Sequence, residues 1–188
     1  ICEVYLDDII VHGKTNEEFL ERLHKIFERM DKYLIKLKPN KCKLGLPKIE
    51  YCGRVISKNG LSMSDKKIAT VTNFPEPTFA KQMKSFLGLA NYFREFVPNH
   101  STIVQPLQAL IPEYKRSNRL VWNAEARLAF TSVKQLINDC PTMYFLIPNC
   151  PLFVHTDASD YGIGGYLFQL VDEKERPVAF VSKSLTAT

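Results

Sequence analysis

The sequence predicts an α+β fold in which helices and antiparallel strands occupy different stretches of the chain. Apolar residues recur every three or four positions in several stretches between residues 15 and 139, and capping residues or prolines mark the ends of these stretches. After Pro141 the period is two, as in strands. With 188 residues, 45% hydrophobic and 24% charged, the composition is globular and differs from that of disordered and disulfide-scaffold chains.

The first 40 residues predict a hairpin followed by a helix. Apolar residues on both sides of Asp7 and Asp8 favour two short strands, with the acidic pair at or near the tip between them. Thr15 and Glu18 form a capping box before an amphipathic helix, which we expect to stop ahead of Pro39.

A second hairpin and a helical module follow. We expect residues 42–44 and 49–56 to form the hairpin, because an Asn-Gly turn signal closes it at residues 59–60. Residues 61–112 then predict three short helices, the longest over residues 78–96. The residues expected to face inward from this longest helix are Phe79, Met83, Phe86, Leu87, Ala90 and Phe93.

The last third of the chain predicts one helix and a small antiparallel sheet. Residues 113–122 are polar and basic and are interpreted as a linker. Asn123 is expected to cap a helix that runs to about Asp139, just as Ser64 is expected to cap the first helix of residues 61–112. Three successive strands with short turns are expected over residues 152–156, 163–170 and 177–181.

Charge is unevenly distributed along the chain, whose formal net charge is +5. Residues 31–60 carry eight basic and two acidic side chains, whereas residues 151–188 carry three basic and five acidic ones. The basic stretch suits a polyanion-binding surface, although a solvated charged face is the commoner interpretation of such a run. The five cysteines are an odd number without a C-x-x-C pair, which favours a reducing compartment and no cysteine-bound structural metal.

Two acidic sites could carry chemistry. Asp7 and Asp8 at a hairpin tip suit a pair of magnesium ions, because hard cations prefer oxygen ligands, but acidic pairs also occur in ordinary turns. Asp157 follows an apolar strand and could hold a metal. Alternatively, it begins a loop in which Asp160 accepts local backbone hydrogen bonds.

Five motifs in order resemble the reverse transcriptases of gypsy-type LTR retrotransposons. Residues 5–8, Tyr-Leu-Asp-Asp, are similar to the Y-x-D-D box, and residues 51–57 to the primer-grip hairpin. Residues 84–98 resemble the F-L-G-L-x-N-Y-Y-R-x-F stretch of the thumb. The helix that begins after Trp122 resembles the entry to the ribonuclease H region, and residues 156–165 resemble its opening motif.

The resemblance implies four segments of an RNA-directed DNA polymerase with an attached ribonuclease H. The segments are a partial palm with the primer-grip hairpin (1–60), a helical thumb (61–112), a connection helix (113–141) and the N-terminal part of a ribonuclease H-like domain (142–188). In the family each active site works with two Mg²⁺ or Mn²⁺ ions, which assist nucleotidyl transfer in one site and RNA-strand hydrolysis in the other.

The resemblance also assigns residue roles. Asp7 and Asp8 would be metal-binding catalytic residues of the polymerase, and Asp157 would be the first carboxylate of the ribonuclease H site. Tyr5 would lie near the primer terminus. The remaining residues expected to contact primer or other nucleic acid are Cys52, Gly53, Arg54, Lys41 and Lys43.

The partners implied are an RNA/DNA primer–template duplex, deoxynucleotides and the rest of a Pol polyprotein, with no membrane, while the oligomeric state stays open. The family's remaining carboxylates would lie outside these 188 residues, so we expect a fragment that is inactive by itself. Its location would be intracellular, in a cytoplasmic particle or the nucleus. The alternatives are an inactive or host-adopted nucleic-acid-binding remnant and, less favoured by the ordered motifs, an unrelated α+β domain.

Overall fold

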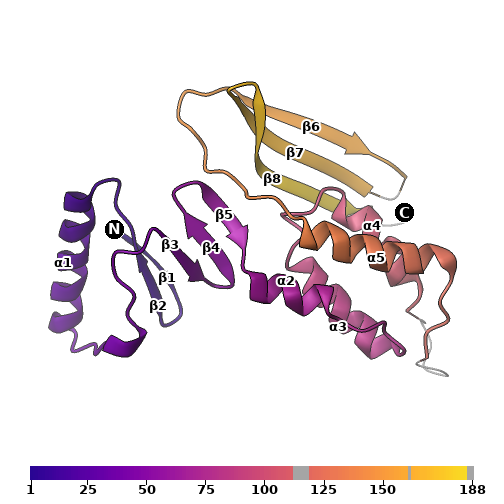
Figure 1. The fold of residues 1–188 in the computed structure, drawn as a ribbon, viewed down its shortest axis with the longest axis horizontal. Helices are drawn as coiled ribbons and strands as arrows, with labels where there is room; N and C mark the ends of the chain where they lie inside the picture. Colours follow the sequence, from indigo (N-terminus) through magenta and orange to yellow (C-terminus); the bar gives the residue numbers. More distant parts are fainter. Residues whose placement is uncertain (112–118, 161, 186–188) are drawn as a thin grey trace. The chain divides into compact units, whose positions relative to one another are not determined.

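In the computed structural model the residues described are 1–111, 119–160 and 162–185, and they form two compact units (Figure 1). The first unit comprises Ile1–Pro47 and the second begins at Lys48. The four-segment division drawn from the sequence remains a prediction. Most of the predicted linker at 113–122, up to residue 118, lies outside the described residues.

The first unit contains a hairpin and one long helix. Its elements are β1 (Cys2–Tyr5), β2 (Asp8–Val11), α1 (Asn16–Lys32) and the short 3₁₀ helix η1 (Pro39–Lys41). The hydroxyl of Thr15 accepts a hydrogen bond from the Glu18 amide at 3.2 Å, which confirms the predicted cap. The helix ends at Lys32, well ahead of Pro39, because Leu34 turns left-handed at φ 56° and the Ile35 amide donates to the carbonyl of Met30.

The second unit opens with a three-stranded meander, which corrects the predicted second hairpin. Strands β3 (Lys48–Tyr51), β4 (Arg54–Ser57) and β5 (Gly60–Met63) pair antiparallel in this order. The apolar run that we expected to be one strand over residues 49–56 is divided by a tight turn at Cys52 and Gly53. Residues 42–44 belong to no strand.

Four helices form the middle of the second unit (Figure 1). They are α2 (Asp65–Thr72), α3 (Ala80–Asn91), α4 (His100–Ala109) and α5 (Ala124–Asn138). The side chain of Asn123 accepts a hydrogen bond from the Ala126 amide at 2.8 Å, confirming the cap of α5, whereas Ser64 makes no side-chain capping bond. The predicted helix over 78–96 is shorter, since turns replace it from residue 92.

The four helices share one hydrophobic core. Met83, Phe86, Ala90 and Phe93 are buried in it as predicted, and Leu87 packs against its edge. The Phe86 ring lies 4.6 Å from that of Phe130 on α5 and 5.4 Å from that of Phe74. Phe79, in contrast, is 49% exposed, because it occupies the N-cap of α3, ahead of the face that the helix buries.

The predicted three-stranded antiparallel sheet is present and its strands are longer than expected. It consists of β6 (Leu152–Ala158), β7 (Gly162–Val171) and β8 (Lys174–Ser184), joined in that order. Tyr161, expected in the first turn, lies outside the described residues. Helix α4 lies against β8, where the Ser101 amide donates to the hydroxyl of Ser182 at 3.1 Å (Figure 1). No helix in the described part of the chain is long and apolar enough to cross a bilayer.

Candidate acidic sites and nucleic-acid interface

The acidic pair lies at the end of the first hairpin, as the sequence predicts. Tyr5 pairs with Asp8 across the two strands, so the turn consists of Leu6 and Asp7. Leu6 adopts a left-handed φ of 54°, an unfavourable conformation for a branched side chain and one that tight hairpin turns require. Asp7, Asp8 and Tyr5 are all exposed, so both carboxylates are open to a ligand from solvent.

The chemistry of this donor set fits magnesium. Two adjacent carboxylates, Asp7 and Asp8, supply hard oxygen ligands, and Mg²⁺ typically uses one or two carboxylates together with water and substrate phosphates. Among the residues that the structure describes, no three His, Cys, Asp or Glu side chains gather as a metal site. The hairpin therefore offers a partial ligand set.

The second hairpin turn, between β3 and β4, is bound tightly to the end of α3. Cys52 and Gly53 have φ angles of 51° and 75°, which places both turn residues in the left-handed region. The hydroxyl of Tyr92 donates a hydrogen bond to the carbonyl of Cys52. A Cβ atom added at Gly53 would lie 2.9 Å from that hydroxyl and 2.8 Å from Cε of Lys67. Glycine is therefore needed here both for its conformation and for the close approach of these side chains.

Arg54 is held by the same group of residues. Its guanidinium forms a 3.0 Å ion pair with Glu95 and lies 5.9 Å from the ring centre of Tyr92 and 5.5 Å from that of Phe96. Exposed pairs of this kind add little stability, but the ring contacts fix the direction of the side chain. Arg54 thus contacts the turns that follow α3, an interaction that the sequence did not predict.

Lys41 and Lys43 are exposed in the first unit, on η1 and in the loop after it. The other predicted contact residues, Cys52, Gly53 and Arg54, belong to the second unit. The basic stretch of the sequence is thus divided between two compact units.

Asp157 lies inside β6, which supports the strand interpretation over the loop interpretation. It is exposed and is paired with Gly164 on β7. A Cβ atom at Gly164 would collide with the side-chain oxygen of Asn99, so glycine lets the segment before α4 approach this part of the sheet. The turn after β6 is closed by the Ser159 amide, which donates to the carbonyl of Gly162 at 2.9 Å.

A row of aromatic side chains in contact with one another lies on the sheet that carries Asp157. The rings of Tyr166 and Phe180 stack with centres 4.8 Å apart, as do those of Tyr166 and Phe168, and His155 lies edge-on to Phe168 at 4.8 Å. Burial, together with a hydrogen bond to Glu175, raises the pKa of Tyr166 to about 12. Tyr166 therefore stays a neutral packing residue at physiological pH.

A known protein family matches the C-terminal part of the chain. Residues 122–188 match the family model described as the RNase H-like domain found in reverse transcriptase. Over 100% of its length the chain is 26% identical to the Pol polyprotein from the transposon opus of Drosophila melanogaster, and over 97% it is 27% identical to the Tf2-3 transposon polyprotein of Schizosaccharomyces pombe. The chain is homologous to the reverse transcriptase and RNase H region of retrotransposon Pol polyproteins.

Solved structures agree with this assignment. The chain superposes with a TM-score of 0.82 on the foamy viral protease–reverse transcriptase dRH in complex with double-stranded DNA, at 27% identity over 98% of this chain and 32% of the other. For the foamy viral enzyme in complex with an RNA/DNA hybrid the TM-score is 0.77, again with 98% of this chain covered and 25% of the other. The region spans a fifth of the opus polyprotein and 14% of the Tf2-3 polyprotein.

Sequence reasoning missed the residues that hold the β3–β4 turn. Tyr92 and Glu95 lie inside the thumb motif that carried the resemblance, but the motif alone does not show that they contact Cys52 and Arg54. Lys67, on α2, gave no signal in the sequence at all. The contacts of Tyr92 and Glu95 join residues 40 and 41 positions apart, and local patterns do not report such pairs.

Proposed function

We propose that this region acts, within a longer Pol polyprotein of the gypsy type, in RNA-directed DNA synthesis and in RNA-strand hydrolysis on a primer–template duplex. The observation that carries the proposal is the exposed Tyr5-Leu6-Asp7-Asp8 turn, in a chain whose whole length is similar to nucleic-acid-bound reverse transcriptases. The location that goes with this function is intracellular, in a cytoplasmic particle or the nucleus.

Asp7 and Asp8 would hold Mg²⁺ or Mn²⁺ for DNA synthesis, and Asp157 would hold it for RNA hydrolysis, with two ions in each complete site. When bound, the ions lower the pKa of the attacking hydroxyl or water and neutralise charge on the phosphate. Tyr5, which pairs with Asp8 across the hairpin, would lie near the primer terminus.

The β3–β4 turn would position the primer strand. Its carbonyl at Cys52 is already bound by Tyr92, and the Arg54 side chain is bound by Glu95, so the turn is presented as a rigid edge. Rigid placement favours catalysis because it lowers the entropy lost when the reacting groups are brought together. Lys41 and Lys43 would add phosphate contacts of low specificity.

The proposal is tested with the full-length polyprotein-derived enzyme carrying Asp7→Asn or Asp157→Asn. Asp7→Asn should abolish primer extension and leave RNA cleavage of a hybrid intact, and Asp157→Asn should do the reverse. The matched controls are Asp31→Asn, exposed in the first unit, and Asp172→Asn, in the turn at the opposite end of β7 from the β6–β7 connection. Equal loss of both activities from either variant would contradict the two-site assignment.

If the full-length enzyme without substitutions binds duplex but shows neither activity, the alternative function is favoured, namely a nucleic-acid-binding remnant without catalysis. The inactivity of the isolated 188 residues stays a prediction, and primer extension by the purified chain with Mg²⁺ would refute it.

A further inference from the structure

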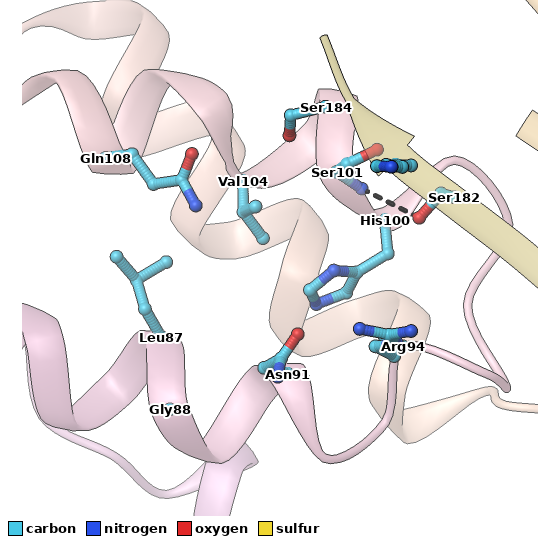
Figure 2. Close-up of a pocket in the computed structure, with 11 residues that line it drawn as sticks. Leu87, Gly88, Asn91, Arg94, His100, Ser101, Val104, Gln108, Ser182 and Ser184 are labelled. Carbon is cyan, nitrogen blue, oxygen red and sulfur yellow. Dashed lines mark hydrogen bonds between the residues drawn. The ribbon is translucent and has the colours of Figure 1, made fainter. Parts of the chain in front are cut away.

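A pocket of about 400 Å³ lies between α3, α4 and the end of β8, and none of its lining residues was assigned a role above (Figure 2). All of its lining residues belong to the second unit. Two of them, Arg94 and Lys183, are cationic, and none of the lining residues is a carboxylate. The remaining polar lining consists of amides and serine hydroxyls, which hydrogen-bond to anions and neutral groups alike. The charge of the pocket therefore favours an anion.

The imidazole of His100 is a buried polar group that lacks a partner in this pocket. His100 is only 6% exposed, and its Nε2 atom has no hydrogen-bond partner among the described residues. Figure 2 shows the ring pointing toward the side of the pocket where Asn91 and Arg94 lie. A buried nitrogen without a hydrogen-bond partner is unfavourable, so a bound ligand that pairs with it would be stabilised by removing this cost.

Burial lowers the pKa of His100, and the neighbouring Arg94 lowers it further, although a hydrogen bond to the carbonyl of Ala90 opposes both effects. Lys183 is the other charged group that lines the pocket, and it is also a cation. An anion placed among these groups would reverse the electrostatic effect and allow Nε2 to take up a proton and donate it in a hydrogen bond.

Serine hydroxyls complete the lining on the side of α4. Ser101 Oγ is buried and has no partner in the described part of the chain, while the Ser101 amide donates to the hydroxyl of Ser182. Because the Ser182 hydroxyl accepts this bond, its own proton stays available to a ligand. Since the pocket also borders the first turn of α4, the partial positive charge of the helix N-terminus adds to that of the side chains.

We propose that this pocket binds a phosphate group, with Arg94 and Lys183 as counter-charges and with His100, Ser101 and Ser182 as hydrogen-bonding groups. The planar fork of arginine matches two phosphate oxygens at once, and hydroxyls satisfy the remaining lone pairs. A phosphodiester of a bound nucleic-acid strand and a free phosphate share this chemistry. Binding of a phosphodiester rests on the proposed function, whereas binding of a free phosphate does not.

The test follows the imidazole signals of His100 by NMR in the 188-residue chain, with His100→Gln to assign them. Inorganic phosphate is titrated at constant ionic strength, and then a short RNA/DNA hybrid is added in phosphate-free buffer. We expect saturable shifts with at least one of the two probes, weakened about tenfold or more in Arg94→Gln and Lys183→Gln. Lys66→Gln, an exposed lysine on α2 outside the pocket, should leave the shifts unchanged.

The outcomes separate this site from the proposed function. A response to phosphate alone supports a site for free anions, and a response to the hybrid alone supports a phosphodiester site. If the hybrid binds and neither the hybrid nor inorganic phosphate moves the His100 signals, the phosphate site is overturned while the proposed function stands. A phosphate response in a chain that binds no hybrid would support the site and count against the proposed function. Shifts that are equal in wild type and Arg94→Gln would also overturn the proposal.

Discussion

The phenolic hydroxyl of Tyr92, at the C-terminal end of α3, donates a hydrogen bond to the main-chain carbonyl of Cys52 in the β3–β4 turn. The ring also lies beneath two cations, with Lys67 Nζ 5.6 Å and the Arg54 guanidinium carbon 5.9 Å from its centre. One side chain therefore joins the proposed primer-positioning turn to the helical module.

Tyr92→Phe removes this hydrogen bond and keeps the ring. We expect unfolding free energy to fall by about 1 kcal/mol and amide exchange at residues 52–54 to speed up, because the turn loses its contact with α3. Urea unfolding and hydrogen-exchange mass spectrometry measure the two effects. Tyr33→Phe, at a tyrosine that is 60% exposed, should change neither, and equal effects in both variants would contradict the prediction.

Gly53→Ala tests the conformation of the same turn. The new methyl group would meet Lys67 and Tyr92 at 2.8 and 2.9 Å in a backbone with φ 75°, so we expect a loss of more than about 1 kcal/mol in urea unfolding. Gly88→Ala on α3 is the matched control, because no atom lies within 4 Å of its Cβ position. It should stabilise the chain by about 0.5–1 kcal/mol. A neutral Gly53→Ala would show that the turn is not constrained.

The aromatic core is tested by Phe86→Ala. Phe86 is fully buried between the rings of Phe74 and Phe130, so its truncation should cost about 3–5 kcal/mol of unfolding free energy, which denaturant melts would measure. Leu128→Ala on α5 removes an apolar side chain that is 70% exposed and should change stability by less than about 0.5 kcal/mol. Similar losses in the two variants would mean that the helical module is packed differently.

Lys41→Gln combined with Lys43→Gln tests the basic surface of the first unit. If each lysine neutralises one phosphate, the slope of log K against log salt for duplex binding should become shallower by about 2. Fluorescence anisotropy with a labelled duplex between about 50 and 200 mM salt measures the slope. Lys66→Gln serves as the control, and an unchanged slope in the double variant would exclude phosphate contacts at these lysines.

Stability should decrease in mild acid because of His100. Its pKa is lowered in the folded chain by burial first and by Arg94 next, so the unfolded chain binds the proton more readily. The stability is complete above the ordinary histidine pKa of about 6.5 and is lost as pH falls from there toward the lower folded value. Chemical denaturation between about pH 7.5 and 5 should show that the unfolding free energy of the wild type decreases as the pH falls. The same dependence is expected in His24→Gln, because His24 is exposed, and a weaker dependence in His100→Gln. An identical slope in all three would refute the prediction.

Several elements could be predicted because the information is local. The polar pair between apolar strands gave the first hairpin and the position of Asp7, and Thr15 and Asn123 gave two helix starts through their own side-chain caps. The alternation after residue 150 gave three antiparallel strands, with Asp157 on the first. Each of these features depends on residues fewer than about ten positions apart.

Other features were not predictable from local patterns. Residues 49–56 form a largely apolar run that continues across Cys52 and Gly53, so the sequence predicts one strand, although the chain turns there. The left-handed turn is held by Tyr92 and Lys67 from distant helices, and the pocket at His100 is completed by Ser182 and Lys183 from β8.

The sequence by itself determined which chemistry-bearing residues are present, where most strands and helices begin, and which family the chain resembles, because caps, periodicity and motifs are properties of neighbouring residues. Only the tertiary structure decided that Arg54 pairs with Glu95, that Gly53 has no room for a side chain, and that His100 is buried beside Arg94. Burial and close approach depend on segments that meet only after folding, such as those of Arg54 and Glu95, 41 positions apart, and of Ser101 and Ser182, 81 positions apart.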